Sequence, residues 1–153
     1  MLRIAILLAG SAALTGCGAG FEDKLAGTWD CGTEQEAPNS KFTVQLSYKA
    51  SGEIDGTMVY EETQGEDTMS VRGGLDGTWD YDGETLTHKM TEEFEELKVN
   101  DEVIPREQVD PALIEGFRGE DSYENPVDLV ESELLWYKDD TRGEVELRCK
   151  KAE

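Results

Sequence analysis

One histidine and three cysteines are the side chains of this sequence with the widest range of chemistry. A serine or cysteine nucleophile needs a general base within hydrogen-bonding reach, and His88 is the only imidazole in the chain. His88 alternates with Leu86 and Met90, which is typical of a strand histidine packed in a core or on a surface. The sequence also has no Gly-x-Ser-x-Gly elbow, phosphate-binding loop or His-Glu-x-x-His motif. We therefore expect a protein that is not an enzyme.

Carboxylates are the most abundant reactive groups, with 35 Asp and Glu residues against 14 Lys and Arg residues. Any two of them could be proposed as an acid pair for glycoside hydrolysis, so no single pair is informative. Asp76, Asp80, Asp82 and Glu84 gather around a turn, but their spacing is not that of an EF-hand loop. Ordinary Asp-Gly turn chemistry accounts for this cluster. We expect neither a metal site nor a cofactor.

The net charge restricts the partners. The formal charge of the chain is −21 at pH 7, whereas nucleic acids and anionic lipid headgroups are bound by basic surfaces. This balance excludes nucleic-acid binding. A solvated, soluble surface explains the acidity without a special ligand.

The first cysteine, Cys17, follows a segment with the layout of a signal peptide. Arg3 gives a positive start, and the run from Ile4 to Leu14 is apolar except for Ser11. The run is too short to cross a bilayer, which takes about 20 apolar residues. We predict that residues 1–16 are a cleaved export signal. Its removal leaves 13 basic and 35 acidic residues, a charge of −22.

The sequence Leu14-Thr15-Gly16-Cys17 resembles the lipobox of bacterial lipoproteins. The resemblance implies transfer of a diacylglyceryl group to the Cys17 sulfur, cleavage before this cysteine and fatty acylation, such as palmitoylation, of the new amino group. Three acyl chains make such an attachment effectively permanent, since each buried methylene contributes about 0.8 kcal/mol. Gly18 stands where an aspartate would resemble an inner-membrane retention signal, so we expect the outer membrane, facing the periplasm. Residues 17–24 would be the lipidated tether and residues 25–153 the folded domain.

With Cys17 assigned to lipid, Cys31 and Cys149 remain as a pair. Disulfides persist in the bacterial periplasm, so we predict a bridge between these two cysteines. Metal binding by the same pair is the alternative, and a single histidine offers it little support.

The folded part shows the alternation of strands. Phe42, Val44, Leu46 and Tyr48 share one face of a strand predicted over residues 41–50. Further strands are predicted over residues 57–63, 69–75, 85–90, 134–138 and 144–150, with a bulge or bend at residues 73–74 and a helical or loop insertion between residues 91 and 125. In that insertion, residues 91–97 are ambiguous between strand and helix, residues 112–117 form a helical turn after Asp110, and residues 119–125 form a loop. The predicted fold class is all-β, an antiparallel meander that closes into a small barrel.

A short motif suggests which barrel this is. Leu25-Ala-Gly-Thr-Trp-Asp30 recurs as Leu75-Asp-Gly-Thr-Trp-Asp80, which suggests two related strand starts. Gly27-Thr28-Trp29 at the first of them resembles the glycine-x-tryptophan signature of lipocalin-like (calycin) barrels. In that family the tryptophan closes one end of the barrel, and a basic residue near the last strand covers it. Arg148 is the matching position. The resemblance also makes the first and last strands neighbours, so a Cys31–Cys149 bridge would join the two edges.

Two functions remain open. Trp29, Tyr48 and Trp79 could line a cavity for a small hydrophobic ligand, as in lipocalins, or could fill the barrel interior. A filled barrel would instead favour a structural or accessory lipoprotein that docks to another envelope protein through residues 91–125, with an apolar patch near Ile114 and Phe117. In both hypotheses the membrane is reached through lipid on Cys17.

Overall fold

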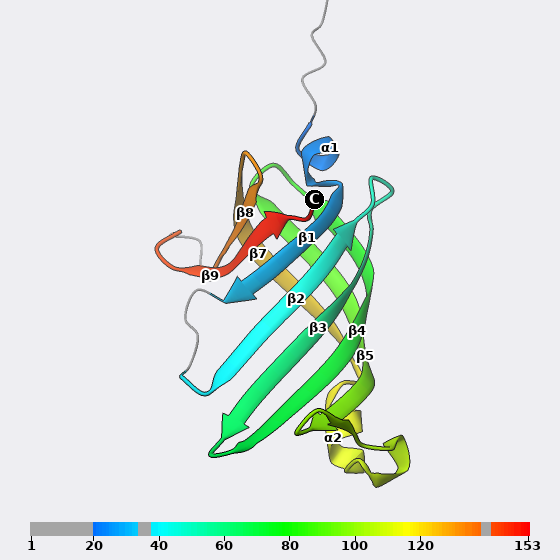
Figure 1. The fold of residues 1–153 in the computed structure, drawn as a ribbon. Helices are drawn as coiled ribbons and strands as arrows, with labels where there is room; N and C mark the ends of the chain where they lie inside the picture. Colours follow the sequence, from blue (N-terminus) through cyan, green and yellow to red (C-terminus); the bar gives the residue numbers. More distant parts are fainter. Residues whose placement is uncertain (1–19, 34–37, 139–141) are drawn as a thin grey trace, which may run out of the picture.

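The computed structural model describes residues 20–33, 38–138 and 142–153, and these residues form an all-β fold. Their eight main strands run antiparallel and close into a barrel, as the sequence predicts (Figure 1). The barrel lies wholly within residues 20–153. The elements are α1 (Phe21–Leu25), β1 (Gly27–Thr33), β2 (Ser40–Tyr48), β3 (Glu53–Gln64), β4 (Asp67–Tyr81), β5 (Thr85–Val99), β6 (Glu102–Val103), η1 (Arg106–Gln108), α2 (Pro111–Gly116), β7 (Gly119–Val130), β8 (Glu133–Tyr137) and β9 (Val145–Lys151).

Pairing of the first strand with the last closes the barrel. β1 pairs with β2 on one side and with β9 on the other, and β5 pairs with both β4 and β7. Cys31 lies directly opposite Cys149 in the β1–β9 ladder, and their sulfurs are at disulfide distance, 2.06 Å. The cysteine pair is therefore where the prediction placed it, at the joint between the two edges of the sheet.

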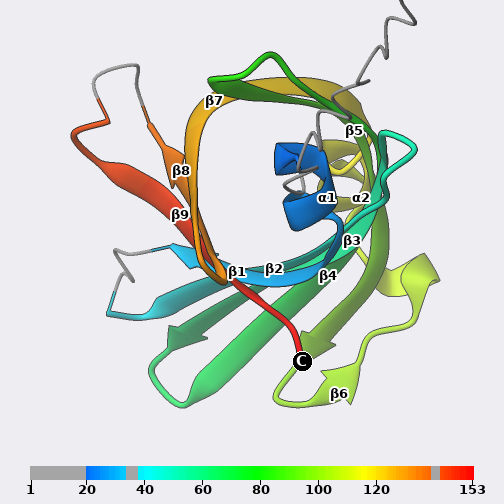
Figure 2. The ribbon, with the colours of Figure 1, turned by 90° about the horizontal axis from the view of Figure 1, so that it is seen from above.

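One end of the barrel is plugged by α1, the short helix that Figure 2 shows inside the ring of strands. Leu25 at its C-terminal end is fully buried, and the Phe21 ring stacks on Tyr81 with 3.7 Å between ring centroids. Residues 21–24 were assigned to the tether from sequence, but they belong to this packed helix. A single turn with two apolar residues four apart carries too little periodicity to be recognised alone.

The opposite end is extended by the long strands β3, β4 and β5. At a bulge, β5 places one extra residue, Glu95, opposite the step from Arg72 to Gly73 on β4. Before the bulge the even-numbered residues of β5 face inward, and after it the odd-numbered residues do. Phe94 and Leu97 therefore both join one apolar cluster. The prediction of a bulge or bend at residues 73–74 is thus confirmed, and residues 91–97 are strand.

The insertion packs against this extension. Ile114 and Phe117, around α2, are half-buried beside Val71 and Phe94 in a second apolar cluster. Asp110 caps α2, accepting a hydrogen bond from the Ala112 amide at 2.9 Å, as predicted. The predicted patch near Ile114 and Phe117 is therefore used mostly inside the molecule.

Two further sequence expectations were wrong. Residues 119–125, expected as a loop, form the first part of β7 and pair with β5. Their side chains up to residue 124 are exposed, so the strand is held by its backbone and lacks an apolar period-two pattern. The second copy of the repeat is also not a strand start, because β4 begins at Asp67 and Trp79 lies near its end.

The disulfide gives the first testable prediction. It closes a sequence separation of 118 residues, and removing a bridge over so long a loop typically costs about 2–5 kcal/mol. The Cys31→Ser/Cys149→Ser variant of a chain beginning at Gly18 should lose free energy of unfolding in this range, measured by urea denaturation. Intact mass of the parent chain should be two hydrogens below the reduced value. Equal stability of the parent and the variant would contradict the role of the bridge in closure.

Candidate functional site

The plugged end is built around Trp29. This side chain is fully buried, and its Nε1 donates a hydrogen bond to the Leu25 carbonyl at 2.7 Å. Lys151 crosses the ring, with Nζ 5.3 Å from the ring centroid, and donates to the Lys24 carbonyl at 2.9 Å. The position over the tryptophan, expected for Arg148, is thus taken by Lys151. Arg148 instead pairs with Glu133 at 3.0 Å.

Above Trp29, a layer of aromatic side chains fills the barrel. The Tyr48 ring meets Trp79 edge-on at 5.8 Å between centroids, and the Tyr48 hydroxyl lies 2.9 Å from Nε2 of His88. His88 stacks on Trp136 with 4.5 Å between centroids. The Trp79 Nε1 donates to the carbonyls of Lys49 and Glu53, both at 3.1 Å. This layer is solid because its rings contact one another and most of their polar atoms are bonded within the protein.

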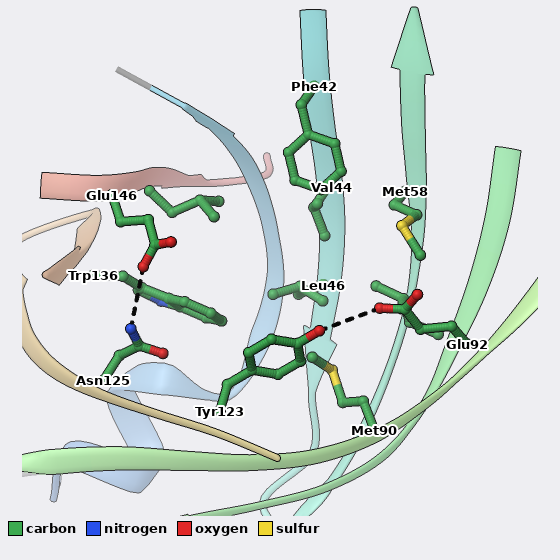
Figure 3. Close-up of a pocket in the computed structure, with 12 residues that line it drawn as sticks. Phe42, Val44, Leu46, Met58, Met90, Glu92, Tyr123, Asn125, Trp136 and Glu146 are labelled. Carbon is green, nitrogen blue, oxygen red and sulfur yellow. Dashed lines mark hydrogen bonds between the residues drawn. The ribbon is translucent and has the colours of Figure 1, made fainter. Parts of the chain in front are cut away.

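Beyond the aromatic layer the interior is not filled. A cavity of about 220 Å³ opens there, and Trp136 belongs both to the layer and to the cavity wall (Figure 3). An apolar cavity of about 150 Å³ holds benzene, so this one is large enough for a ring or a short alkyl chain. The wall is mostly apolar, and its lining residues are Phe42, Val44, Leu46, Met58, Leu75, Met90, Glu92, Tyr123, Asn125, Trp136, Glu146 and Leu147.

Four of these residues are polar, and they form two hydrogen-bonded pairs that Figure 3 shows on different sides of the cavity. The Tyr123 hydroxyl donates to Glu92 at 3.5 Å and to Asp121 at 3.3 Å. The Asn125 amide donates to Glu146 at 3.4 Å and to the Tyr137 carbonyl at 3.2 Å. The cavity therefore combines an apolar interior with a few oriented polar groups, which is the usual make-up of a small-molecule site.

Burial shifts the acid-base properties of the first pair. Desolvation raises the pKa of Glu92, and the charge of Asp121 raises it further, while the Tyr123 hydrogen bond lowers it. The pKa of Tyr123 rises to about 12, first through desolvation and then through the nearby charges of Glu92 and Asp121. Tyr123 is consequently a neutral hydrogen-bond donor at any physiological pH.

The residues proposed from sequence occupy other places than the cavity wall. Trp29, Tyr48 and Trp79 lie in the filled part of the barrel, and none of them is among the lining residues. Cys17, the proposed lipidation site, lies outside the described residues. The alternating apolar residues Phe42, Val44 and Leu46 were the sequence signal for the cavity wall. They line the cavity because the early part of β2 lies away from the plugged end.

Turn chemistry explains the place of Asp82 in the acidic cluster, whereas Asp76 and Asp80 lie within strand β4. Asp82 Oδ1 accepts hydrogen bonds from the amides of Thr85 at 2.8 Å and Glu84 at 2.9 Å. These bonds lower the pKa of Asp82, since they favour the carboxylate form. The cluster is thus part of the β4–β5 hairpin, where a carboxylate fixes a tight turn.

Comparison of the chain with protein-family models, curated proteins and solved structures gave no match. In the part of the chain that the structure describes, no helix is long and apolar enough to cross a membrane.

His88 gives a prediction for acid stability. Its side chain is fully buried, and desolvation lowers its pKa from 6.5 to about 4. Between about pH 6.5 and pH 4, the His88 imidazole is protonated in the unfolded chain and neutral in the folded chain. The free energy of unfolding therefore falls as the pH drops toward 4. The lowered pKa of His88 corresponds to a loss of free energy of unfolding on the order of 3 kcal/mol.

The measurement is the free energy of unfolding of the parent chain and of His88→Gln at several pH values between 7 and 4.5. The parent should lose more stability than the variant across this range, because His88 titrates only in the parent and all other groups titrate in both proteins. Parallel pH profiles for the two proteins would contradict the assignment.

Proposed function

We propose that this chain is a non-enzymatic, lipocalin-like lipoprotein of the bacterial envelope, whose barrel binds a small hydrophobic molecule. The observation that carries the binding role is the apolar cavity of about 220 Å³, next to a solid aromatic layer that separates it from the plugged end. A folded barrel of this size is able to fill its interior with side chains. Here the filling by aromatic side chains stops at Trp136, which belongs both to the stack and to the cavity wall.

Trp136 carries a buried donor without a partner. Trp136 is 6% exposed, and its Nε1 has no hydrogen-bond partner among the described residues. A buried donor without a partner costs about 1–3 kcal/mol. This N–H is itself covered by protein, so its cost belongs to the aromatic layer, and the case for an occupant rests on the apolar cavity.

The lipocalin-like assignment is supported by architecture rather than by any match to a family. The barrel has eight strands, an early Gly-x-Trp at the start of β1 and a cation over that tryptophan. The cation comes from β9, the last strand, as the resemblance leads one to expect, although it is Lys151.

The lipid anchor fits the position of the plug. α1 begins at Phe21, four residues after Cys17, so the anchored segment meets the barrel at its plugged end. The cavity lies on the other side of the aromatic layer. In this arrangement the binding site is turned away from the membrane surface that holds the protein.

Docking through residues 91–125 is the weaker candidate. Ile114 and Phe117, its proposed contact residues, are half-buried against the barrel's second apolar cluster. Their apolar surface is largely used within the molecule, whereas that of the cavity is not.

Filling the cavity tests the binding role. A chain beginning at Gly18, purified from the periplasm of an expressing bacterium, should carry a small mass in native mass spectrometry that is lost on denaturation, or should bind added 1-hexanol. Met58→Trp, which places a large ring in the cavity, should abolish both signals. Val59→Trp is the matched control, because the neighbouring side chain on β3 points to the other face of the sheet. A parent chain that carries nothing and binds no 1-hexanol would refute the proposal.

The anchor has a separate test in the full-length chain. The parent protein should sediment with membranes and have an intact mass raised by its acyl chains, whereas Cys17→Ser should remain in the soluble fraction without this added mass. Cys31→Ser is the control, since it removes a cysteine that the lipid does not use. Membrane attachment that survives Cys17→Ser would contradict the lipoprotein assignment.

A further inference from the structure

The charge of the cavity is entirely negative. Glu92 and Glu146 are the charged members of its wall, and the other lining residues are apolar or neutral polar side chains. Figure 3 shows the two carboxylates reaching the cavity from different sides, Glu92 from β5 and Glu146 from β9.

No cation of the protein neutralises these two carboxylates within the described residues. Their hydrogen-bond partners are neutral donors at long distances, Tyr123 at 3.5 Å for Glu92 and Asn125 at 3.4 Å for Glu146. By contrast, other carboxylates have close cations, such as Asp128 with Arg142 at 2.6 Å. Desolvation raises the pKa of Glu92, which is the behaviour of a carboxylate that is half-buried without a positive neighbour.

We propose that the preferred ligand of this cavity is a small organic cation with an apolar body, such as a protonated alkylamine, arylamine or quaternary ammonium compound. The inference rests on the proposed binding role and specifies its ligand. The apolar body would occupy the space between Leu46, Met58 and Met90, and the cationic group would lie between Glu92 and Glu146.

The size of the cavity selects a small free molecule over a membrane lipid with the same headgroup chemistry. A volume of about 220 Å³ accepts a ring or a short alkyl chain, and two long acyl chains do not fit. The carboxylates also act against acids of the same size. A like charge near either carboxylate is repelled, and the chain's overall charge of −21 adds to this repulsion.

A series of three six-carbon probes separates charge from hydrophobicity. Hexylammonium, 1-hexanol and hexanoate share an apolar chain and differ at the head, so their dissociation constants can be compared by isothermal titration calorimetry at pH 7. The protein is the chain from Gly18, which contains the whole barrel. A single opposite charge at about 4 Å changes affinity by roughly fivefold even at the dielectric constant of water. We expect hexylammonium to bind at least about fivefold more tightly than 1-hexanol, and hexanoate more weakly than both.

Two double variants with the same change in net charge locate the effect. Glu92→Gln/Glu146→Gln should bring hexylammonium to the affinity that the same variant has for 1-hexanol. An unchanged circular-dichroism spectrum and urea midpoint show that the variant is folded. Glu93→Gln/Glu124→Gln removes two carboxylates from neighbouring exposed positions outside the cavity wall. This control should keep the preference for hexylammonium.

Each other result overturns the inference. If 1-hexanol binds but hexylammonium has no advantage, the cavity binds hydrophobic molecules without a preference for cations. If the preference survives Glu92→Gln/Glu146→Gln, it arises from the overall charge and not from this site. If none of the three probes binds, the proposed binding role fails together with the inference.

Discussion

Strand β1 pairs with β9 in antiparallel register, from Trp29 opposite Lys151 to Thr33 opposite Leu147, and this pairing turns a sheet into a barrel. Without it, both edges of the sheet would present unpaired backbone groups. The same ladder sets Cys31 against Cys149 and brings Lys151 over Trp29. The cross-link, the plug and the enclosed interior all depend on this single pairing of the chain's ends.

The enclosed interior is divided along its axis. At the plugged end, Leu25 and Trp29 are fully buried and exclude solvent, and the Tyr48–His88–Trp136 stack forms a second layer. Beyond it, Val44 and Leu46 on β2 lie beside Met58 on the neighbouring strand β3, and these side chains are smaller than the aromatic rings of the layer below. The cavity thus follows from where the large side chains are placed along the strands.

Much of the barrel could be predicted from sequence because its strands have one apolar face. The alternation of Phe42, Val44 and Leu46 identified β2 with its correct inward side. The first half of β7 was missed because its exposed polar residues carry no such pattern, and its place is decided by hydrogen bonds to β5. α1 was missed because one helical turn has no measurable period, although Phe21 and Leu25 are spaced for a common face.

The site was harder to predict than the fold. Aromatic type suggested Trp29, Tyr48 and Trp79 as wall residues, but the depth of a side chain in a barrel depends on strand register, which a single sequence does not contain. Glu92 and Glu146 were indistinguishable from the chain's other carboxylates before the register was known. Their meeting at one cavity depends on the successive registers of β5 with β7, β7 with β8 and β8 with β9.

The closure has a consequence for how the protein is made. β1 is the first strand of the barrel to leave a ribosome, and its partner β9 is the last. Until β9 emerges, β1 has one open edge, Trp29 lacks its covering lysine and Cys31 remains a free thiol. Contacts of such long sequence separation form slowly. Closure of the barrel, its cross-link and the covering of Trp29 therefore all wait for the final strand.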